Sequence, residues 1–135
     1  MSVAILHDIG KLKELKMDGL GSAEYTVEGN LYGHLYLGAV MVKEACSVCM
    51  VNENSKNIQL LIHMILSHHG KMEYGAVKLP VTREAYVLHI LDELDSKLWV
   101  YEDVMKNTEP GTFSQPNRWL DGAVVYNSDV DLNSR

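Results

Sequence analysis

The residues best suited to chemistry begin close to the start of the chain. His7 and Asp8 are adjacent, and Lys11 follows three residues later inside an otherwise apolar run. Burying an imidazole, a carboxylate and an ammonium together is costly unless something pairs them. A divalent cation bound by His7 and Asp8, with Lys11 directed at a bound anion, would provide that pairing. This stretch therefore indicates a metal centre that handles an anionic substrate.

Further candidate ligands lie downstream, at His34, at the pair His68 and His69, and at Asp92. Adjacent helical residues lie about 100° apart, so the histidine pair can reach one site from a helix end but not from mid-helix. Imidazole and carboxylate ligands together suit Mn²⁺, Fe²⁺, Zn²⁺ or Co²⁺ better than Ca²⁺. Two such ions about 3.5–4 Å apart can clamp a phosphoryl oxygen. The sequence thus predicts one or two divalent ions, Mn²⁺ first, with Fe²⁺, Co²⁺, Zn²⁺ and Mg²⁺ as alternatives.

The remaining histidines and a second aspartate need separate interpretations. His63 lies five positions before His68, about 140° around a helix, and is predicted to be structural. His89 lies three positions before Asp92 and could share its face as a ligand, but a helix-surface residue or a partner that supports a ligand is the favoured interpretation. Asp95 follows Asp92 by one helical turn and is predicted to be a supporting acid.

Four helices are predicted to position these residues. Apolar periodicity indicates helices over 2–16, 31–51, 58–68 and 83–107, the last with Thr82 as its N-cap. The glycine-rich stretch 17–30 reads as a loop, with a short hairpin around Tyr25 to Val27. Past Pro110 the periodicity stops, which predicts an irregular flap or short strand and then a frayed polar tail, 128–135. The expected fold is all-α, with one domain over 1–127.

Composition narrows the class of protein. The 135 residues are 47% hydrophobic and carry a net charge of −6, which argues against a nucleic-acid binder held by a broad basic surface. No apolar run is long enough for a membrane span and no leader opens the chain, so a cytoplasmic protein is expected. Cys46 and Cys49 form a lone C-x-x-C inside a predicted helix, which favours packed free thiols over a zinc or redox site.

In chain order the motifs are His7-Asp8-x-Gly10-Lys11, Gly33-His34, Leu66-Ser67-His68-His69-Gly70 and Asp92-x-x-Asp95. This order resembles the HD-domain metal-dependent phosphohydrolases. The flanking stretches 25–34, 67–75 and 106–120 resemble one branch more closely, the YhaM-type 3′→5′ exoribonucleases, which join an OB-fold domain to an HD domain. The resemblance covers about residues 3 to 126. It implies an HD-domain helical bundle with an irregular C-terminal tail.

The resemblance also implies a role for each candidate residue. His7, Asp8 and Asp92 would bind a first metal ion, and Asp8 would bridge to a second ion held by His34, His68 and His69. Asp8 and Lys11 would act in catalysis, with Lys11 on the phosphate. Water would attack phosphorus in line and release a nucleoside 5′-monophosphate from single-stranded RNA or DNA.

One departure from the family pattern matters. The family places a further ligand histidine and the OB-fold before the His-Asp pair, and neither precedes His7 here. A truncated chain with weakened activity is therefore expected, with core surface that a second subunit could cover. Two other functions stay open. One is an HD hydrolase of nucleotides or cyclic dinucleotides, although Gly70 to Gly75 lacks that branch's Gly-Tyr-Pro motif. The other is a non-catalytic, dimerising HD module.

Overall fold

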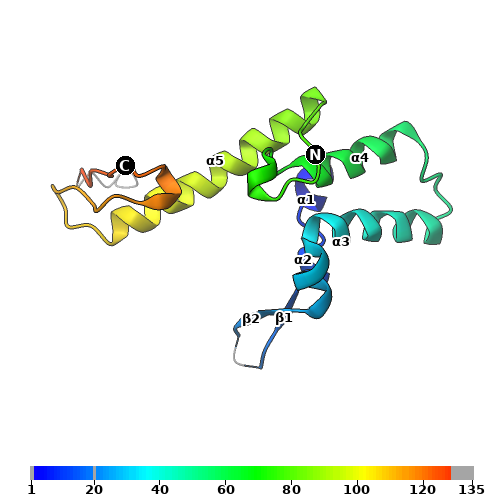
Figure 1. Cartoon of the computed structure of the whole chain (residues 1–135), viewed down its shortest axis with the longest axis horizontal. Coiled ribbons are helices and arrows are strands. Elements are labelled where there is room, and N and C mark those ends of the chain that lie inside the picture. The colour runs from blue at the N-terminus through cyan, green and yellow to red at the C-terminus, as the bar shows by residue number, and fades with distance from the viewer. Residues whose placement is uncertain (1, 20, 129–135) are drawn as a thin grey trace, which may run out of the picture. The chain divides into compact units, whose positions relative to one another are not determined.

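The computed structural model describes residues 2–19 and 21–128 of the chain. It is mostly helical, as predicted, and the one sheet among the described residues is a two-stranded hairpin (Figure 1). The chain divides into two compact units, Met1–Ile90 and Leu91–Arg135. This division does not test the prediction of one domain over 1–127, which stays a prediction. Within the described residues, no helix is long and apolar enough to cross a membrane.

The N-terminal segment is broken where a single helix over 2–16 was predicted. It forms α1 (Ser2–Leu6), a turn over 7–10 and α2 (Lys11–Glu14). Close packing explains the turn, because a Cβ on Gly10 would lie 1.9 Å from the carbonyl oxygen of His34. The predicted continuous helix was therefore wrong: apolar spacing alone does not reveal a backbone-to-backbone contact.

The predicted hairpin exists and includes Tyr25, but it begins earlier in the chain than predicted and ends before Val27. It pairs β1 (Leu15–Met17) with β2 (Ala23–Tyr25) in antiparallel register. Thr26 ends it: its hydroxyl donates to the carbonyl of Lys13 at 2.8 Å and accepts from the N–H of Gly29 at 2.9 Å. Thr26 is thereby the N-cap of the next helix, α3 (Val27–Val48), which begins four residues earlier than predicted.

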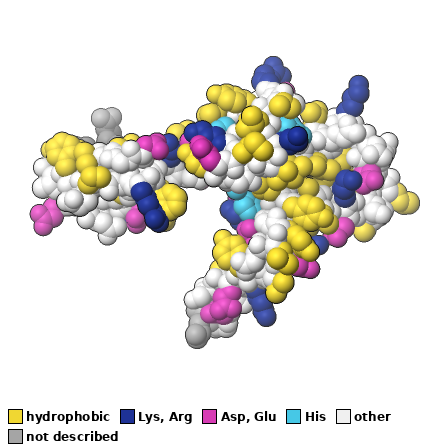
Figure 2. Space-filling model, in the orientation of Figure 1, with side chains coloured by type: hydrophobic (Ala, Val, Ile, Leu, Met, Phe, Trp, Pro, Cys, Tyr) yellow, Lys and Arg dark blue, Asp and Glu magenta, His cyan; other side chains and the backbone are white. Residues whose placement is uncertain are grey.

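The first unit is built on α3 and α4 (Lys56–Ser67), which lie side by side (Figure 1). Their core joins Val42, Cys46 and Ile65. Both helices lie within a few residues of the predicted ranges. Cys46 is buried and Cys49 exposed, both free, so the expectation of packed thiols holds for the first. Hydrophobic side chains also gather on the surface in this part of the molecule (Figure 2).

A second core cluster closes the first unit around the start of α5 (Arg83–Lys106). Met64, Ala85 and Leu88 pack together there with Val3. Between α4 and α5 the chain forms a short 3₁₀ turn, η1 (Met72–Tyr74). The N–H of Ala85 donates to the hydroxyl of Thr82, as predicted for an N-cap. The start and end of α5 therefore agree with the sequence.

The second unit holds the rest of α5 and an irregular segment. That segment contains η2 (Arg118–Leu120) and one isolated bridge between Phe113 and Tyr126. The amide of Asn127 donates to the carbonyls of Met105 and Thr108, at 3.2 and 2.9 Å. These contacts confirm an ordered irregular flap past Pro110. The frayed end predicted for 128–135 lies, apart from its first residue, outside the described residues.

Candidate metal centre

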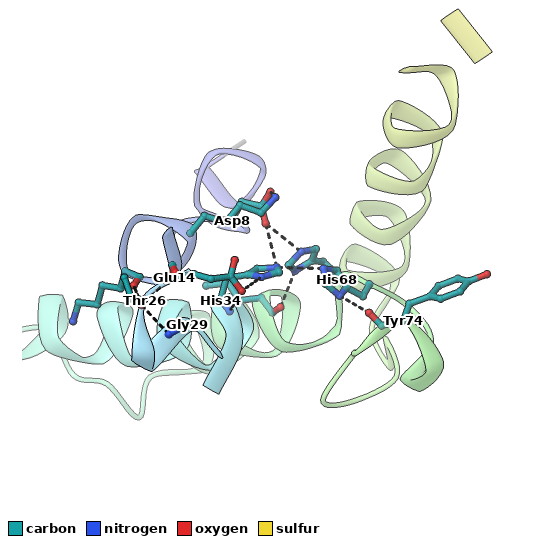
Figure 3. Close-up of polar contacts among 11 residues, drawn as sticks. Asp8, Glu14, Thr26, Gly29, His34, His68 and Tyr74 are labelled. Atoms are coloured by element: carbon teal, nitrogen blue, oxygen red, sulfur yellow. Dashed lines mark hydrogen bonds and ion pairs between the residues drawn. The ribbon is translucent and has the colours of Figure 1, made fainter. Parts of the chain in front are cut away.

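Five of the predicted ligands meet in the first unit, and Figure 3 labels three of them, Asp8, His34 and His68. They form two groups, and His68 belongs to both. Within each group the potential ligand atoms all lie within 4.8 Å of one another. The groups are His34, His68 and His69, and His7, Asp8 and His68. The sequence placed these five residues on three separate segments, and the fold brings the segments together.

Local backbone geometry explains how the three segments meet. A kink at Gly33, with φ of 70° and ψ of 160°, interrupts α3 so that His34 opens its continuing part. Those torsions suit glycine, since a side chain would be strained there. The turn over 7–10 follows α1 and packs on this part of α3 through Gly10. His68 caps α4, and His69 follows directly. The predicted placement of the histidines at helix ends is confirmed.

All four candidate imidazoles are anchored through Nδ1. The acceptors are Ala4 O for His7, Glu14 Oε1 for His34, Ile65 O for His68 and Tyr74 O for His69, at 2.8, 3.1, 2.8 and 2.8 Å. Carbonyl and carboxylate oxygens accept hydrogen bonds, so each Nδ1 carries the hydrogen. In the neutral ring this leaves a lone pair on each Nε2. Anchoring of this kind is typical of histidines that bind a metal.

The Nε2 atoms converge on Asp8 and on one another. The Nε2 atoms of His34 and His69 are 3.2 Å apart. Asp8 Oδ1 lies 3.5 Å from the Nε2 of His34 and 3.6 Å from that of His68. It is buried and has no hydrogen-bond partner among the residues that the structure describes. A cation between lone pairs that face one another stabilises them, and metal–nitrogen bonds of about 2.0–2.1 Å put neighbouring ligand atoms roughly 3–3.4 Å apart. The residues fit a divalent metal.

The carboxyl group of Asp8 is held in its charged form. Burial alone would raise its pKa, but the neighbouring imidazole of His68 and the ammonium of Lys11 outweigh burial and hold the pKa well below its usual range. The Nζ of Lys11 lies 2.6 Å from Oδ2. Lys11 was predicted to contact a bound phosphate. In this structure it pairs with Asp8, and two of its three N–H donors remain for such an anion.

Two other histidines can now be assigned. His89 is buried, donates from Nδ1 to the carbonyl of His68 at 3.1 Å, and lies against Gly70, where a Cβ would come within 2.3 Å of the ring. It is therefore not a helix-surface residue and it contacts the backbone of a candidate ligand; its role as a support for a metal ligand stays a prediction. The Nε2 of His63 accepts from the N–H of Val81 at 3.2 Å, outside both candidate groups.

Asp92 and Asp95 lie on the part of α5 that belongs to the second unit. Asp92 is half-buried and Asp95 is exposed. Neither is a member of the two candidate groups. The predicted role of Asp92 as a ligand, and that of Asp95 as its support, stay predictions.

The sequence interpretation missed Glu14. This carboxylate is 7% exposed and accepts from both the backbone N–H and Nδ1 of His34. No spacing along the sequence points to Glu14, because the N-terminal helix is broken between His7 and Glu14 and the partner of Glu14 is His34, on another helix.

The fold and this histidine-aspartate cluster define a class of protein. The HD domain family matches residues 2–97. The chain belongs to the HD domain family.

Within that family the chain is similar to several curated proteins. It is 39% identical over 122 residues to the 3′-5′ exoribonuclease YhaM of Bacillus licheniformis, covering 90% of this chain and 38% of that protein. It is 41% identical over 124 residues to that of Listeria monocytogenes serotype 4b (strain CLIP80459), covering 91% and 38%. For Bacillus subtilis (strain 168) the identity is 40% over 111 residues, covering 82% and 34%. The chain thus spans less than two fifths of these relatives. No solved structure matches it.

Proposed function

We propose that this chain is the HD hydrolase domain of a metal-dependent 3′→5′ exoribonuclease. The observation that carries the proposal is the buried Asp8 Oδ1, which faces two imidazole Nε2 atoms within a cluster of anchored histidines. The substrate class comes from the relatives, whose name states a 3′-5′ exoribonuclease. The substrate would be single-stranded RNA, or single-stranded DNA, and the product a nucleoside 5′-monophosphate.

The chain's own residues would contribute orientation and charge. One ionised carboxylate, Asp8, and the Nε2 atoms of His7, His34, His68 and His69 would hold one or two ions. Such an ion supplies a Lewis acid for a phosphoryl oxygen and lowers the pKa of a neighbouring water. Lys11 would offer its free N–H donors to the phosphate, close to Asp8 Oδ2. Hydrolysis would break the bond from phosphorus to the 3′ oxygen of the penultimate nucleotide, and this oxygen would leave as the new 3′ hydroxyl. The phosphate would stay on the 5′ oxygen of the terminal nucleoside, which is released as the 5′-monophosphate.

The cluster also bears on which metal it holds. Four imidazoles and a carboxylate exclude an all-oxygen site of the kind that Ca²⁺ prefers. Mn²⁺ is our proposed ion, because it accepts mixed nitrogen and oxygen ligands and is common in two-ion phosphoryl chemistry. Fe²⁺, Co²⁺, Zn²⁺ and Mg²⁺ are the alternatives. A cytoplasmic location remains part of the proposal.

The test is an isosteric change at Asp8. Asp8→Asn keeps the shape of the side chain but removes the charge that opposes the histidine lone pairs. We expect at least about a 100-fold loss of turnover, since even partners of a ligand cost 10–100-fold, together with loss of bound Mn²⁺. The measurements are release of nucleoside 5′-monophosphate from a uniformly labelled single-stranded RNA and metal content per chain.

Asp103→Asn is the matched control, because Asp103 is exposed on α5 and outside the candidate groups. Unchanged turnover and metal content in Asp8→Asn would contradict the proposal. Faster turnover of a cyclic dinucleotide than of RNA would favour a cyclic-dinucleotide hydrolase. Bound Mn²⁺ without turnover of either substrate would favour a non-catalytic module.

A further inference from the structure

We propose that Glu14 is a positioning residue that orients and polarises His34 for metal binding. The proposal rests on the metal centre of the proposed function and adds to it a carboxylate–imidazole pair behind one ligand. Glu14 lies on α2, His34 on α3, and their contact is drawn in Figure 3. Because Glu14 contacts the side of the ring opposite Nε2, it acts through His34 and not on the ion.

Two hydrogen bonds from one residue converge on Glu14. Its Oε1 accepts from the backbone N–H of His34 at 3.0 Å and from Nδ1 of the same residue at 3.1 Å. The first bond fixes the main chain of His34, and the second fixes the rotation of its ring. With both in place, Nε2 can point only toward Asp8 and His69, from which it lies 3.5 and 3.2 Å away.

The kink at Gly33 explains why an acceptor is needed here. At the start of a helical segment the first N–H groups lack intrahelical partners, and His34 opens the segment that follows the kink. Glu14 satisfies that N–H and places a negative charge where the helix dipole favours one. The kink and the carboxylate therefore belong to a single arrangement that presents the His34 ring to the cluster.

The chemistry of this anchor differs from that of the other candidate ligands. The Nδ1 atoms of His7, His68 and His69 donate to neutral main-chain carbonyls, whereas that of His34 donates to a carboxylate. A hydrogen bond to an ionised acceptor is stronger. It also makes the imidazole a better electron donor at Nε2. We therefore infer that Glu14 strengthens binding of an ion to the group of His34, His68 and His69.

The main chain of Glu14 is fixed by hydrogen bonds that do not involve its side chain. A substitution can therefore change the carboxylate without disturbing the backbone. The carbonyl oxygen of Glu14 accepts from the N–H of Thr26 at 2.9 Å and from the Thr26 hydroxyl at 3.2 Å. Glu14→Gln keeps an acceptor oxygen but loses the negative charge. Glu14→Leu occupies the space of the Glu14 side chain but removes both the acceptor and the charge.

The experiment titrates Mn²⁺ alone into the metal-free chain by calorimetry. Loss of a partner of this kind typically weakens metal binding by about 10–100-fold. We expect that weakening in Glu14→Leu and a smaller one in Glu14→Gln. The control is Glu44→Gln, a change of the same type at an exposed carboxylate that pairs with Lys13 at 3.0 Å; its affinity should equal the wild type.

A second measurement does not depend on affinity. Nitrogen-15 spectra of the histidine rings with Zn²⁺ bound report which ring nitrogen carries hydrogen. The wild type should show His34 protonated at Nδ1, and Glu14→Leu should lose the hydrogen-bonded shift of that proton. A purely structural role would lower the melting temperature of both variants yet leave the Mn²⁺ affinity of the folded chains unchanged.

The outcomes separate the inference from the proposed function. If the wild type binds Mn²⁺ and both Glu14 variants bind it equally well, the inference is overturned and the metal centre stands. The inference also fails if Glu44→Gln loses as much affinity as Glu14→Gln. If the wild type binds neither Mn²⁺ nor Zn²⁺, the metal centre itself is overturned, and the proposed function with it.

Discussion

At the scale of single residues, hydrogen bonds from Nδ1 fix the orientation of the imidazole rings in the candidate site. Five histidines donate from Nδ1 to an oxygen, four of them candidate ligands and the fifth, His89, a contact of the His68 backbone. His63 differs, because it uses Nε2 as an acceptor for a backbone N–H. The tautomer therefore distinguishes His63 from the four candidate ligands, although His89 shares their Nδ1–H tautomer outside the two groups.

His69 and His63 provide a matched pair for testing this distinction. His69→Gln removes a candidate ligand, so we expect Mn²⁺ affinity to fall at least about 10-fold, the lower end of what losing even an outer partner costs. His63→Gln should leave affinity unchanged, since its ring lies outside both groups. Calorimetric titration with Mn²⁺ measures both. Equal losses in the two variants would show that the tautomer pattern does not identify ligands.

At the scale of secondary-structure elements, the site depends on how closely α3 approaches the turn over 7–10. Gly10 permits this contact, because a Cβ there would meet main-chain atoms of His34 and Gly38 at 1.9 and 2.6 Å. Main-chain atoms cannot rotate away as a side chain can. The turn and α3 must therefore separate if Gly10 gains a side chain, and Asp8 would move away from His34.

Gly10→Ala should accordingly lower both stability and metal affinity. Overpacking a well-packed contact costs typically about 1–3 kcal/mol, and here the clash is with backbone, so the upper part of that range is expected. Gly19→Ala is the control, because nothing lies within 4 Å of a Cβ built there. Thermal unfolding of the metal-free chains measures the difference. A Gly10→Ala chain as stable as Gly19→Ala would contradict the close packing described.

The elements also show how far the sequence alone could lead. Apolar periodicity placed α4 and α5 within two residues, and Thr82 was recognised as a cap because side-chain capping is a local interaction. The break after Leu6 was not predicted, because it arises from the contact of Gly10 with α3. Glu14 was missed for the same reason: its partner, His34, lies twenty residues away. Ligand types could be inferred from chemistry, whereas the residues behind them depend on the tertiary structure.

At the scale of the whole molecule, the first unit carries every member of the two candidate groups. These residues come from the turn after α1, the continuing part of α3 and the end of α4. The site therefore exists only when the three segments are folded together. An ion that binds the folded chain and not the unfolded chain must stabilise it by mass action.

Metal should for this reason raise the melting temperature. A free Mn²⁺ concentration 100 times the dissociation constant adds about 2.7 kcal/mol to the free energy of unfolding. For a chain of this size that corresponds to roughly 5–10 °C. Differential scanning calorimetry with Mn²⁺ and with EDTA measures the shift. Asp8→Asn should show little or none, and an equal shift in that variant would mean that the ion binds elsewhere.

His68 has one further consequence. Its ring is 1% exposed, its Nδ1 is committed to Ile65, and its Nε2 is shared by both groups. A nitrogen lone pair forms one coordinate bond, so the two groups cannot both use His68 at the same moment. If two ions were bound, Asp8 could offer one oxygen to each, but His68 could bind only one of them. The other ion would then have one nitrogen ligand fewer, and we would expect it to exchange more readily.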